Sequence, residues 1–339
     1  MRALIRLSAS ADALAPLTFT ASASMVPLLG APLLEPLIAQ LAHTGASEIT
    51  LLHERLEHDV ADYFRDGRRF GVLITHAAAQ PGVDPEIQVL AALRRLGRGD
   101  EPILYLETAG WTDARADELA AFHRQRGAQV SATGPAGRRL AVISPEAFEA
   151  GDIWSRAVDF GRTVRWSPVS RLAEWWDLTM TALRGQAPGI LPTFPEIAPG
   201  VYSAAPAEMW RHARIEGPVW IGPGSCLAPG SIVRGPAWIG SGCVVESGVR
   251  LDRCVVENHT RLREPLSLSE RYVVRNRSLA PDGSTLVLDD IISHPSDREE
   301  RDSTAGDLLR LASRVSGFSW GAPRTAAARA IAHKAATRA

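Results

Sequence analysis

The residues that could do chemistry are few and lie far apart in the sequence. His212 and His259 could each act as a general base, because an imidazole titrates near neutral pH. Exposed surface positions are the simpler interpretation of both histidines, since no Ser-His-Asp order, Walker loop or zinc-ligand spacing accompanies them.

The cysteine and lysine contents restrict the chemistry further. Cys226, Cys243 and Cys254 have no metal-ligand spacing and cannot all pair with one another. We therefore expect buried, reduced thiols and no metal site. The only lysine is Lys334, close to the C-terminus, so no lysine side chain is available in the folded body of the chain.

Length and composition indicate a two-domain globular protein. The 339 residues can bury two cores, and the hydrophobic content of 45% and charged content of 22% are ordinary for such proteins. The net charge of −1 gives no general attraction to nucleic acid or to an anionic membrane. The sequence has no apolar run of membrane-spanning length and no sustained apolar leader, so we expect no membrane span and a cytoplasmic location.

A period of six residues runs through the region 197–290. A helix has a period of 3.6 residues and an alternating strand a period of two, so neither produces this pattern. Hexapeptide repeats predict a left-handed parallel β-helix of about five triangular coils, with one apolar residue of each strand pointing to the axis. One five-residue step interrupts the series, which reads Ile215, Ile221, Leu227, Val233, Ile239, Val245, Leu251, then Val256, Leu262, Leu268, Val274, Ala280 and Leu286.

Two tryptophans occupy matching places in an internal repeat. The segment Gly-Pro-Val-Trp-Ile-Gly that contains Trp220 recurs as Gly-Pro-Ala-Trp-Ile-Gly around Trp238, one coil later. The two indoles are therefore expected on the same face of the β-helix. A structural stack is the simpler interpretation, and a docking face for the first domain or another subunit is the alternative, because aromatic side chains are enriched at interfaces.

Residues 1–190 have the pattern of a mixed α/β domain. Amphipathic periods predict helices at 32–43, 57–64, 87–96, 114–124 and 171–183, and short apolar runs predict strands at 49–52, 71–75 and 103–106. This alternation favours a largely parallel sheet covered by helices. Residues 291–339 are predicted to form a charged hinge, a short helix and a basic tail.

Four segments follow one another in an order typical of a known family. They begin at Leu14 (Leu-Ala-Pro-Leu-Thr), Met25 (Met-Val-Pro-Leu-Leu-Gly), Asp62 (Asp-Tyr-Phe-Arg-Asp-Gly) and Ala198 (Ala-Pro-Gly-Val-Tyr). In this the chain resembles the sugar-1-phosphate nucleotidylyltransferases, such as mannose-1-phosphate guanylyltransferase, over most of residues 1–290. The resemblance implies a Rossmann-like (GT-A-like) nucleotidyltransferase domain followed by a left-handed β-helix.

The resemblance also identifies chemical groups of the family that this chain lacks. The family's phosphate-binding lysine corresponds here to Ala23, and its magnesium-binding aspartate corresponds to Ala109. Glu107 is the candidate substitute for that metal ligand. The family's glycine-rich loop, whose backbone amides cradle the nucleotide phosphates, corresponds to Ser8, Ala9, Ser10, Ala11, Asp12 and Ala13, which include neither glycine nor arginine.

We therefore predict a catalytically inactive relative of the nucleotide-sugar pyrophosphorylases, with no cofactor. It would bind a nucleotide sugar weakly or not at all. It would act as a regulatory or scaffolding subunit in nucleotide-sugar and exopolysaccharide precursor supply, as a homo-oligomer or with an active pyrophosphorylase. Two alternatives stay open: an active nucleotidylyltransferase that uses Glu107 for magnesium and arginine for the lysine, and a hexapeptide-repeat acyltransferase that uses His259.

Overall fold

Two units make up the chain in the computed structural model. The first comprises Met1–Thr193 with Ala280–Ser284, and the second comprises Phe194–Leu279 with Thr285–Ala339. The structure describes residues 1–7, 14–19, 21–53, 58–80, 82–97, 101–107, 110–134, 139–150, 153–191, 194–204, 206, 209–263, 266–288 and 292–293. Among the helices of these ranges, none has the length and apolar character needed to cross a lipid bilayer.

A seven-stranded sheet forms the centre of the first unit. Its strands are β1 (Arg2–Arg6), β4 (Glu48–His53), β5 (Leu73–Ala78), β6 (Ile103–Glu107), β8 (Val130–Thr133), β9 (Arg139–Ile143) and β10 (Ala157–Asp159). They lie in the order β10-β8-β9-β6-β1-β4-β5, and β1 runs parallel to both β6 and β4. The antiparallel strand β9 and the N-terminal strand β1 are absent from the sequence prediction, which expects a largely parallel sheet.

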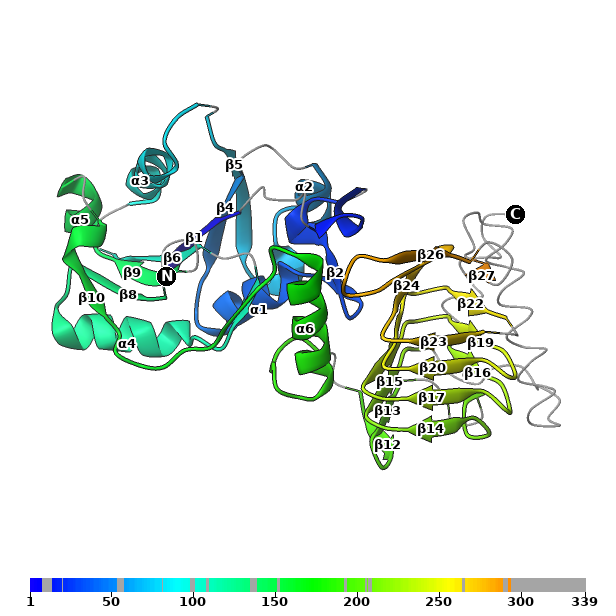
Figure 1. Ribbon diagram of the computed structural model, residues 1–339. Helices are drawn as coiled ribbons and strands as arrows, with labels where there is room; N and C mark the ends of the chain where they lie inside the picture. The colour runs from blue at the N-terminus through cyan, green and yellow to red at the C-terminus, as the bar shows by residue number, and fades with distance from the viewer. Residues whose placement is uncertain are drawn as a thin grey trace, which may run out of the picture. The chain divides into compact units, whose positions relative to one another are not determined.

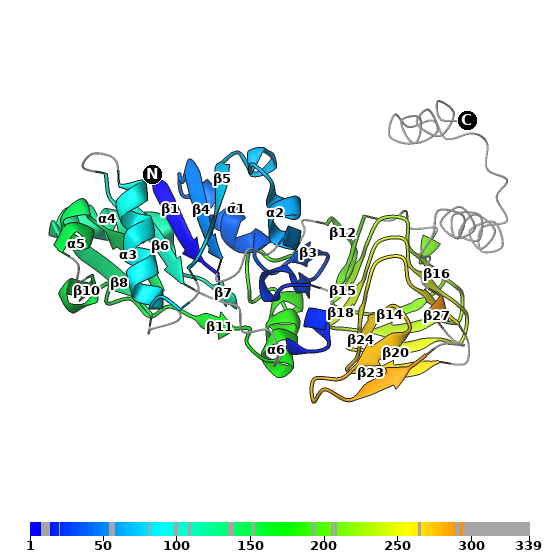
Figure 2. The ribbon, with the colours of Figure 1, turned by 90° about the horizontal axis from the view of Figure 1, so that it is seen from above.

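Helices cover both faces of this sheet (Figures 1 and 2). They are α1 (Glu35–His43), α2 (His58–Phe64), α3 (Pro85–Leu96), α4 (Ala116–Arg126) and α5 (Pro145–Ala150). Leu37 and Leu41 of α1 contribute to the core on one face, together with α2 and α4. Val89 and Leu93 of α3 contribute to the core on the other face, together with α5. A spacing of four residues places each pair on one side of its helix, which explains why these sequences form amphipathic helices.

Smaller elements complete the first unit. They are α6 (Leu172–Leu183), the strand pairs β2 (Pro27–Leu28) with β3 (Ala31–Pro32) and β7 (Gly110–Thr112) with β11 (Trp166–Pro168), and the 3-10 turns η2 (Leu17–Phe19), η3 (Ala23–Met25), η4 (Arg68–Phe70) and η5 (Trp154–Arg156). The indole Nε1 of Trp175 donates to the carbonyl oxygen of Pro27 at 2.7 Å. This bond ties α6 to β2.

Three stacks of short parallel strands build the second unit, and successive strands join the three stacks in turn (Figure 1). The first stack holds β14 (Arg214–Glu216), β17 (Ile232–Arg234), β20 (Arg250–Asp252) and β23 (Ser267–Ser269). The second holds β13 (Val201–Ser203), β15 (Val219–Ile221), β18 (Ala237–Ile239), β21 (Val255–Val256) and β24 (Tyr272–Val274), with β12 (Glu196–Ala198) antiparallel at its start. The third holds β16 (Cys226–Leu227), β19 (Val244–Val245) and β22 (Arg261–Leu262). This arrangement is compatible with the predicted β-helix.

The apolar positions of the hexapeptide series form a single core from Ile221 to Leu268. The end of the series differs from the prediction. Val273, not Val274, continues the core, because a second five-residue step follows Leu268 and pairs Val256 with Val273. The chain then turns into the antiparallel strands β25 (Arg277–Leu279) and β26 (Thr285–Val287), and Leu286 is 47% exposed. The parallel coils therefore end at β24.

Trp220 and Trp238 are register partners in the second stack. Trp220 stacks on Tyr202 with 4.4 Å between ring centroids, and Trp238 stacks on Phe194 at 6.0 Å. Only 7% and 4% of the two tryptophans is exposed. Aromatic neighbours within the same unit thus supply a structural reason for both residues, and a docking role remains a proposal.

The three cysteines are buried in the second unit, as the sequence predicts. Burial raises the pKa of Cys226 and of Cys254 to about 11, and it also raises the pKa of Cys243. The thiols are therefore protonated at neutral pH and lack the thiolate that metal binding or oxidation needs.

Most of the predicted hinge, helix and basic tail at 291–339 lies outside the described residues. The described part of this segment is β27 (Ile292–Ser293), which pairs antiparallel with β22. The helix and the basic tail stay predictions.

Two kinds of corner lead from the first stack to the second. Gly-Pro dipeptides make the first two corners. Arg253 and Glu270 stand at the two later corners, with φ of 49° and 52°. In the strand register, each later corner is one residue shorter than a Gly-Pro corner. A Cβ atom on Gly235 would overlap the backbone carbonyl oxygen of Pro218 in the preceding coil. Close approach of two backbones therefore requires glycine at this corner.

We predict that Gly235→Ala destabilises the second unit. The added methyl meets backbone rather than a side chain that could move, so the free energy of unfolding should fall by about 1–3 kcal/mol. Urea unfolding followed by tryptophan fluorescence measures the change. Ser247→Ala, at an exposed position of the same unit, is the control and should change the free energy by less than about 0.5 kcal/mol. Equal midpoints for the two variants would contradict the prediction.

Candidate functional site

The carboxyl ends of β1, β4, β5 and β6 meet at one edge of the first sheet. From β1 the chain continues through β4 and β5 on one side, whereas β6 joins β1 on its other side. The direction of strand order therefore changes between β1 and β6. In open α/β sheets, ligands bind at such a switch point, outside the carboxyl ends of the strands.

Three charged residues stand side by side at this edge. Arg6 ends β1 and pairs in register with Glu107, which ends β6. Glu107 in turn pairs in register with Arg139 at the start of β9. Side chains alternate between the two faces of a strand, and Leu4, Tyr105 and Ala141 share a core on one face. Arg6, Glu107 and Arg139 lie two residues from these, so all three project to that same face.

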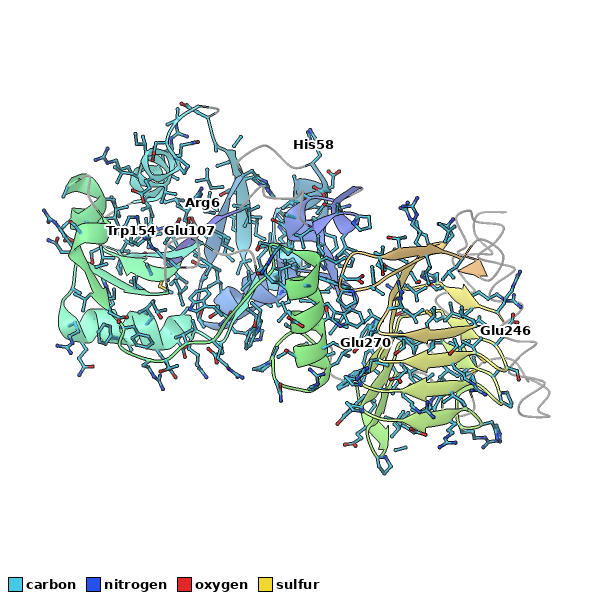
Figure 3. The ribbon with its side chains drawn as sticks, in the orientation of Figure 1. Arg6, His58, Glu107, Trp154, Glu246 and Glu270 are labelled. Atoms are coloured by element: carbon cyan, nitrogen blue, oxygen red, sulfur yellow. The ribbon has the colours of Figure 1, made fainter. Side chains whose placement is uncertain are left out.

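The Arg6 guanidinium and the Glu107 carboxylate form an ion pair and a charge-assisted hydrogen bond, from Arg6 Nη1 to Glu107 Oε1. Figure 3 shows the two residues next to each other, with Trp154 close by. The Arg6 and Glu107 side chains are only 22% and 13% exposed. Removing one partner of a largely desolvated pair leaves the other charge poorly solvated, so the pair is held together strongly.

A pocket of about 200 Å³ opens beside this pair. Its wall contains two rings, since Tyr105 lies 5.6 Å from Trp154 between ring centroids. The Arg139 guanidinium lies 4.1 Å above the Trp154 ring, which is a cation–π contact. Burial and the neighbouring Glu107 charge raise the pKa of Tyr105, so its hydroxyl stays protonated. The pocket is lined by Arg6, Glu86, Val89, Tyr105, Glu107, Arg139 and Trp154.

A second pocket, of about 220 Å³, is also lined by Arg6. Arg6 thus borders both pockets, and its guanidinium is the cation that they share. The remaining lining residues are Leu52, Ala79, Gln80, Gly82, Val83, Pro85 and Gln88.

Two histidines on β4 and β5 lie at the same edge. The carbonyl oxygen of Arg65 can only accept, so His76 Nε2 carries a proton and donates to it at 3.1 Å. His76 Nδ1 then accepts from His53 Nε2 at 3.0 Å. Burial, and then the neighbouring His76, lower the pKa of His53 to about 4, although Asp59 opposes the shift. His53 is fully buried and therefore neutral at pH 7.

The residues predicted from the family resemblance fall into separate groups. Ser8, Ala9, Ser10, Ala11, Asp12, Ala13 and Ala109 lie outside the described residues. Ala23 is buried in η3 and brings no polar group to the site. Glu107 is at the switch point, paired with Arg6. Trp220 and Trp238 belong to the second unit.

The two histidines considered as general bases are both exposed in the second unit. His212 Nε2 accepts from Nε of the adjacent Arg211 at 3.1 Å. The His259 ring lies against Gly242, where a Cβ would come within 2.6 Å of Nδ1. Each histidine thus has an ordinary local environment, and no described pocket reaches either of them.

The described residues at the switch point do not fit a magnesium ion. Magnesium prefers carboxylate oxygens in octahedral geometry, usually shared with phosphate oxygens. Glu107 is the carboxylate at the strand end. On each neighbouring strand an arginine is its register partner, Arg6 on β1 and Arg139 on β9. A dication placed there would face two positive charges. Nor do the described ranges contain a cluster of three or more histidine, cysteine or acidic side chains suited to a metal.

Arg6, Arg139, Tyr105 and Trp154 are site residues that the sequence analysis misses. Arg6 is missed because β1 is not among the predicted strands. The apolar run 3–5 between Arg2 and Arg6 is the signal that could have identified it, since a short apolar run with charged ends is typical of a buried central strand. Arg139 and Trp154 reach the pocket through tertiary contacts, for which the sequence carries no local signal.

Comparison with known proteins gives a family match within the first unit. Residues 9–139 match the family model described as nucleotidyl transferase. This range includes the parallel strands β4, β5 and β6 and the first residue of β9. This match agrees with the resemblance to the sugar-1-phosphate nucleotidylyltransferase family.

One relative is similar along most of its length. A UTP–glucose-1-phosphate uridylyltransferase of Synechocystis is 24% identical, and the alignment covers 86% of this chain and 93% of the relative. Among solved structures, a protein assigned as a glucose-1-phosphate thymidylyltransferase of Bacillus anthracis, in complex with sucrose, is 10% identical, with 58% of this chain and 98% of that chain covered. Its TM-score of 0.44 is too low to support a structural argument.

We predict that acid destabilises the first unit through His53. His53 binds a proton below about pH 6.5 in the unfolded chain, whereas in the folded chain His53 stays neutral down to about pH 4. The free energy of unfolding should therefore fall as the pH drops from about 6.5 to 4, by up to roughly 3 kcal/mol from this residue. Urea unfolding at pH 7, 6 and 5 measures the slope.

Two variants isolate the contribution of His53. His53→Gln should be less stable at pH 7 but should lose stability less steeply on acidification. His43→Gln, at an exposed position of the same unit, should keep the wild-type slope. An unchanged slope in His53→Gln would show that another group carries the acid sensitivity.

Proposed function

We propose that this protein is a non-catalytic member of the nucleotide-sugar pyrophosphorylases. The observation that carries the proposal is the Arg6–Glu107 ion pair at the switch point of the sheet. Phosphoryl transfer from a nucleoside triphosphate needs cations and amides arranged around the phosphates. Here the Glu107 carboxylate pairs with Arg6 and projects to the same face as Arg139.

The residues around the phosphate site support the same proposal. Ala23 stands where the family has its lysine, and a buried methyl group cannot replace an ammonium. Lys334 is the only lysine of the chain. Residues 8–13, which correspond in sequence to the family's glycine-rich loop, contain no glycine. Each lost charge-stabilising contact typically costs about 3–4 kcal/mol at a transition state.

We propose that the second unit is a left-handed β-helix and that the protein acts through assembly. Its partners would be further copies of this chain or an active pyrophosphorylase, and its role regulatory or scaffolding, in the supply of nucleotide sugars for polysaccharides. The face that carries Trp220 and Trp238 is the proposed contact surface. A cytoplasmic location follows from this role, because nucleotide sugars are made there.

Active catalysis is the second candidate function, because the Synechocystis relative is named as a uridylyltransferase. In that case Glu107 would hold magnesium and an arginine would replace the lysine. Arg6 and Glu107 form an ion pair, so a metal-binding role for Glu107 and a phosphate-binding role for Arg6 would each require the pair to break. Arg6 and Glu107 neutralise one another, so neither is available for a ligand while the pair is intact.

We predict that the purified protein releases no pyrophosphate above background from any nucleoside triphosphate with a hexose 1-phosphate and magnesium. The loss of three or more contacts would lower the rate by roughly a millionfold or more if their effects add. A coupled pyrophosphate assay measures the rate, with the Synechocystis uridylyltransferase as positive control. Pyrophosphate release at an ordinary enzymatic rate would contradict the proposal that the protein is non-catalytic. A thermal stabilisation by nucleotide that requires magnesium would favour the active alternative.

A further inference from the structure

The pocket beside Trp154 has an electrostatic arrangement that suits an anion rather than a metal. We infer that it is a phosphate-binding site that the chain keeps filled with its own carboxylate, Glu107, so that an incoming phosphate group must displace this side chain. The inference deepens the proposed function and rests on it. It names an autoinhibitory contact at the same site and the chemical class of ligand that the contact excludes.

Strand pairing places the Glu107 backbone between those of two arginines. Neighbouring strands lie about 4.8 Å apart, so the backbones of Arg6 and Arg139 are separated by roughly 10 Å with that of Glu107 midway. All three side chains border the same pocket. The carboxylate accepts from Arg6 Nη1, and the Arg139 side chain borders the same pocket.

Carboxylates and phosphates bind guanidinium groups in the same way. Both present paired oxygens to the planar fork of arginine and form charge-assisted hydrogen bonds. A phosphate group and the Glu107 carboxylate therefore compete for one place. The carboxylate has the advantage because it is attached to the chain, and an attached group acts at a millimolar or higher effective concentration.

The ligand that fits is a phosphate or pyrophosphate group. The lining holds two arginines and two glutamates, so its charges cancel, and neutralising Glu107 leaves one net positive charge. Of the two glutamates, Glu86 is exposed to solvent, so its charge is screened more than that of Glu107. The Arg139 guanidinium covers one face of the Trp154 ring at 4.1 Å, so that face is not available for stacking with a nucleotide base.

The test is the affinity of Glu107→Gln for inorganic pyrophosphate. Isothermal titration is carried out on the full chain in the presence of EDTA, so that no metal contributes. Glutamine keeps the shape of the side chain and removes its charge. We expect wild-type protein to bind pyrophosphate weakly and the variant to bind at least about tenfold more tightly, equivalent to about 1.4 kcal/mol.

Two control variants each remove a different carboxylate, one that lines the same pocket and one outside it. Glu86→Gln removes a charge from the same pocket and should change the affinity by less than about threefold, because Glu86 is exposed to solvent. Glu101→Gln removes a carboxylate that lies 3.7 Å from Arg2, at the opposite end of β1, and should have no effect. Thermal melting confirms that each variant is folded.

A double variant shows whether the gained anion site is the one described. Adding Arg6→Met to Glu107→Gln should cancel most of the gain, because one of the two guanidinium groups is then missing. The inference is overturned if Glu107→Gln binds no more tightly than Glu86→Gln, or if wild-type protein already binds as tightly as Glu107→Gln. UTP serves as a second probe: a preference for UTP over pyrophosphate in the variant would show that a base also binds.

These outcomes separate the inference from the proposed function. Pyrophosphate release by wild-type protein would overturn the proposed function whatever Glu107→Gln binds. Failure of Glu107→Gln to gain affinity, in a wild-type protein that is inactive, would overturn the autoinhibitory contact alone.

Discussion

The pairing of Arg6 with Glu107 is the interaction on which the site depends, and the sheet dictates it. β1 is parallel to β6, and apolar side chains on both faces of these strands fix their register. A shift by one residue would move Leu4 and Tyr105 to the opposite face and expose charges to the core. The strand ends are therefore held in place by the hydrophobic core, and the two charges meet whether or not a ligand is present. Their burial makes separation costly, because a single charge would remain without its partner.

This arrangement separates the determinants of the fold from those of the chemistry. The core of the first unit needs apolar residues at alternating strand positions and on one side of each helix, and these are present. The chemistry of the family needs polar groups at strand ends and in loops, where the core imposes no requirement. Strand ends can therefore change charge without loss of the fold. Similarity to the family thus supports the architecture of the first unit, whereas function has to be argued from the residues at the edge of the sheet.

Much of the fold is predictable from the sequence because it repeats. Ile221 and Leu227 belong to a six-residue period that neither a helix nor an alternating strand produces, and they lie in the core of the second unit. The end of the series is not predictable in the same way. Val274 keeps the six-residue spacing, but the corner at Glu270 is one residue shorter, so Val273 takes the core position. A turn that replaces Gly-Pro by a single residue with positive φ leaves no mark in the apolar pattern.

The site is less predictable because the role of Glu107 depends on residues that are distant in the chain. Glu107 taken alone is a carboxylate at the end of a central strand, and a metal ligand is a reasonable interpretation. Arg6 lies about a hundred residues earlier and Arg139 about thirty later, and only the order of strands in the sheet brings all three together. Beside two guanidinium groups the same carboxylate is a counter-ion, since a magnesium ion would have to displace a charge-assisted hydrogen bond and accept two positive neighbours. The sheet topology, rather than the identity of any one residue, therefore decides between a metal ligand and an internal anion.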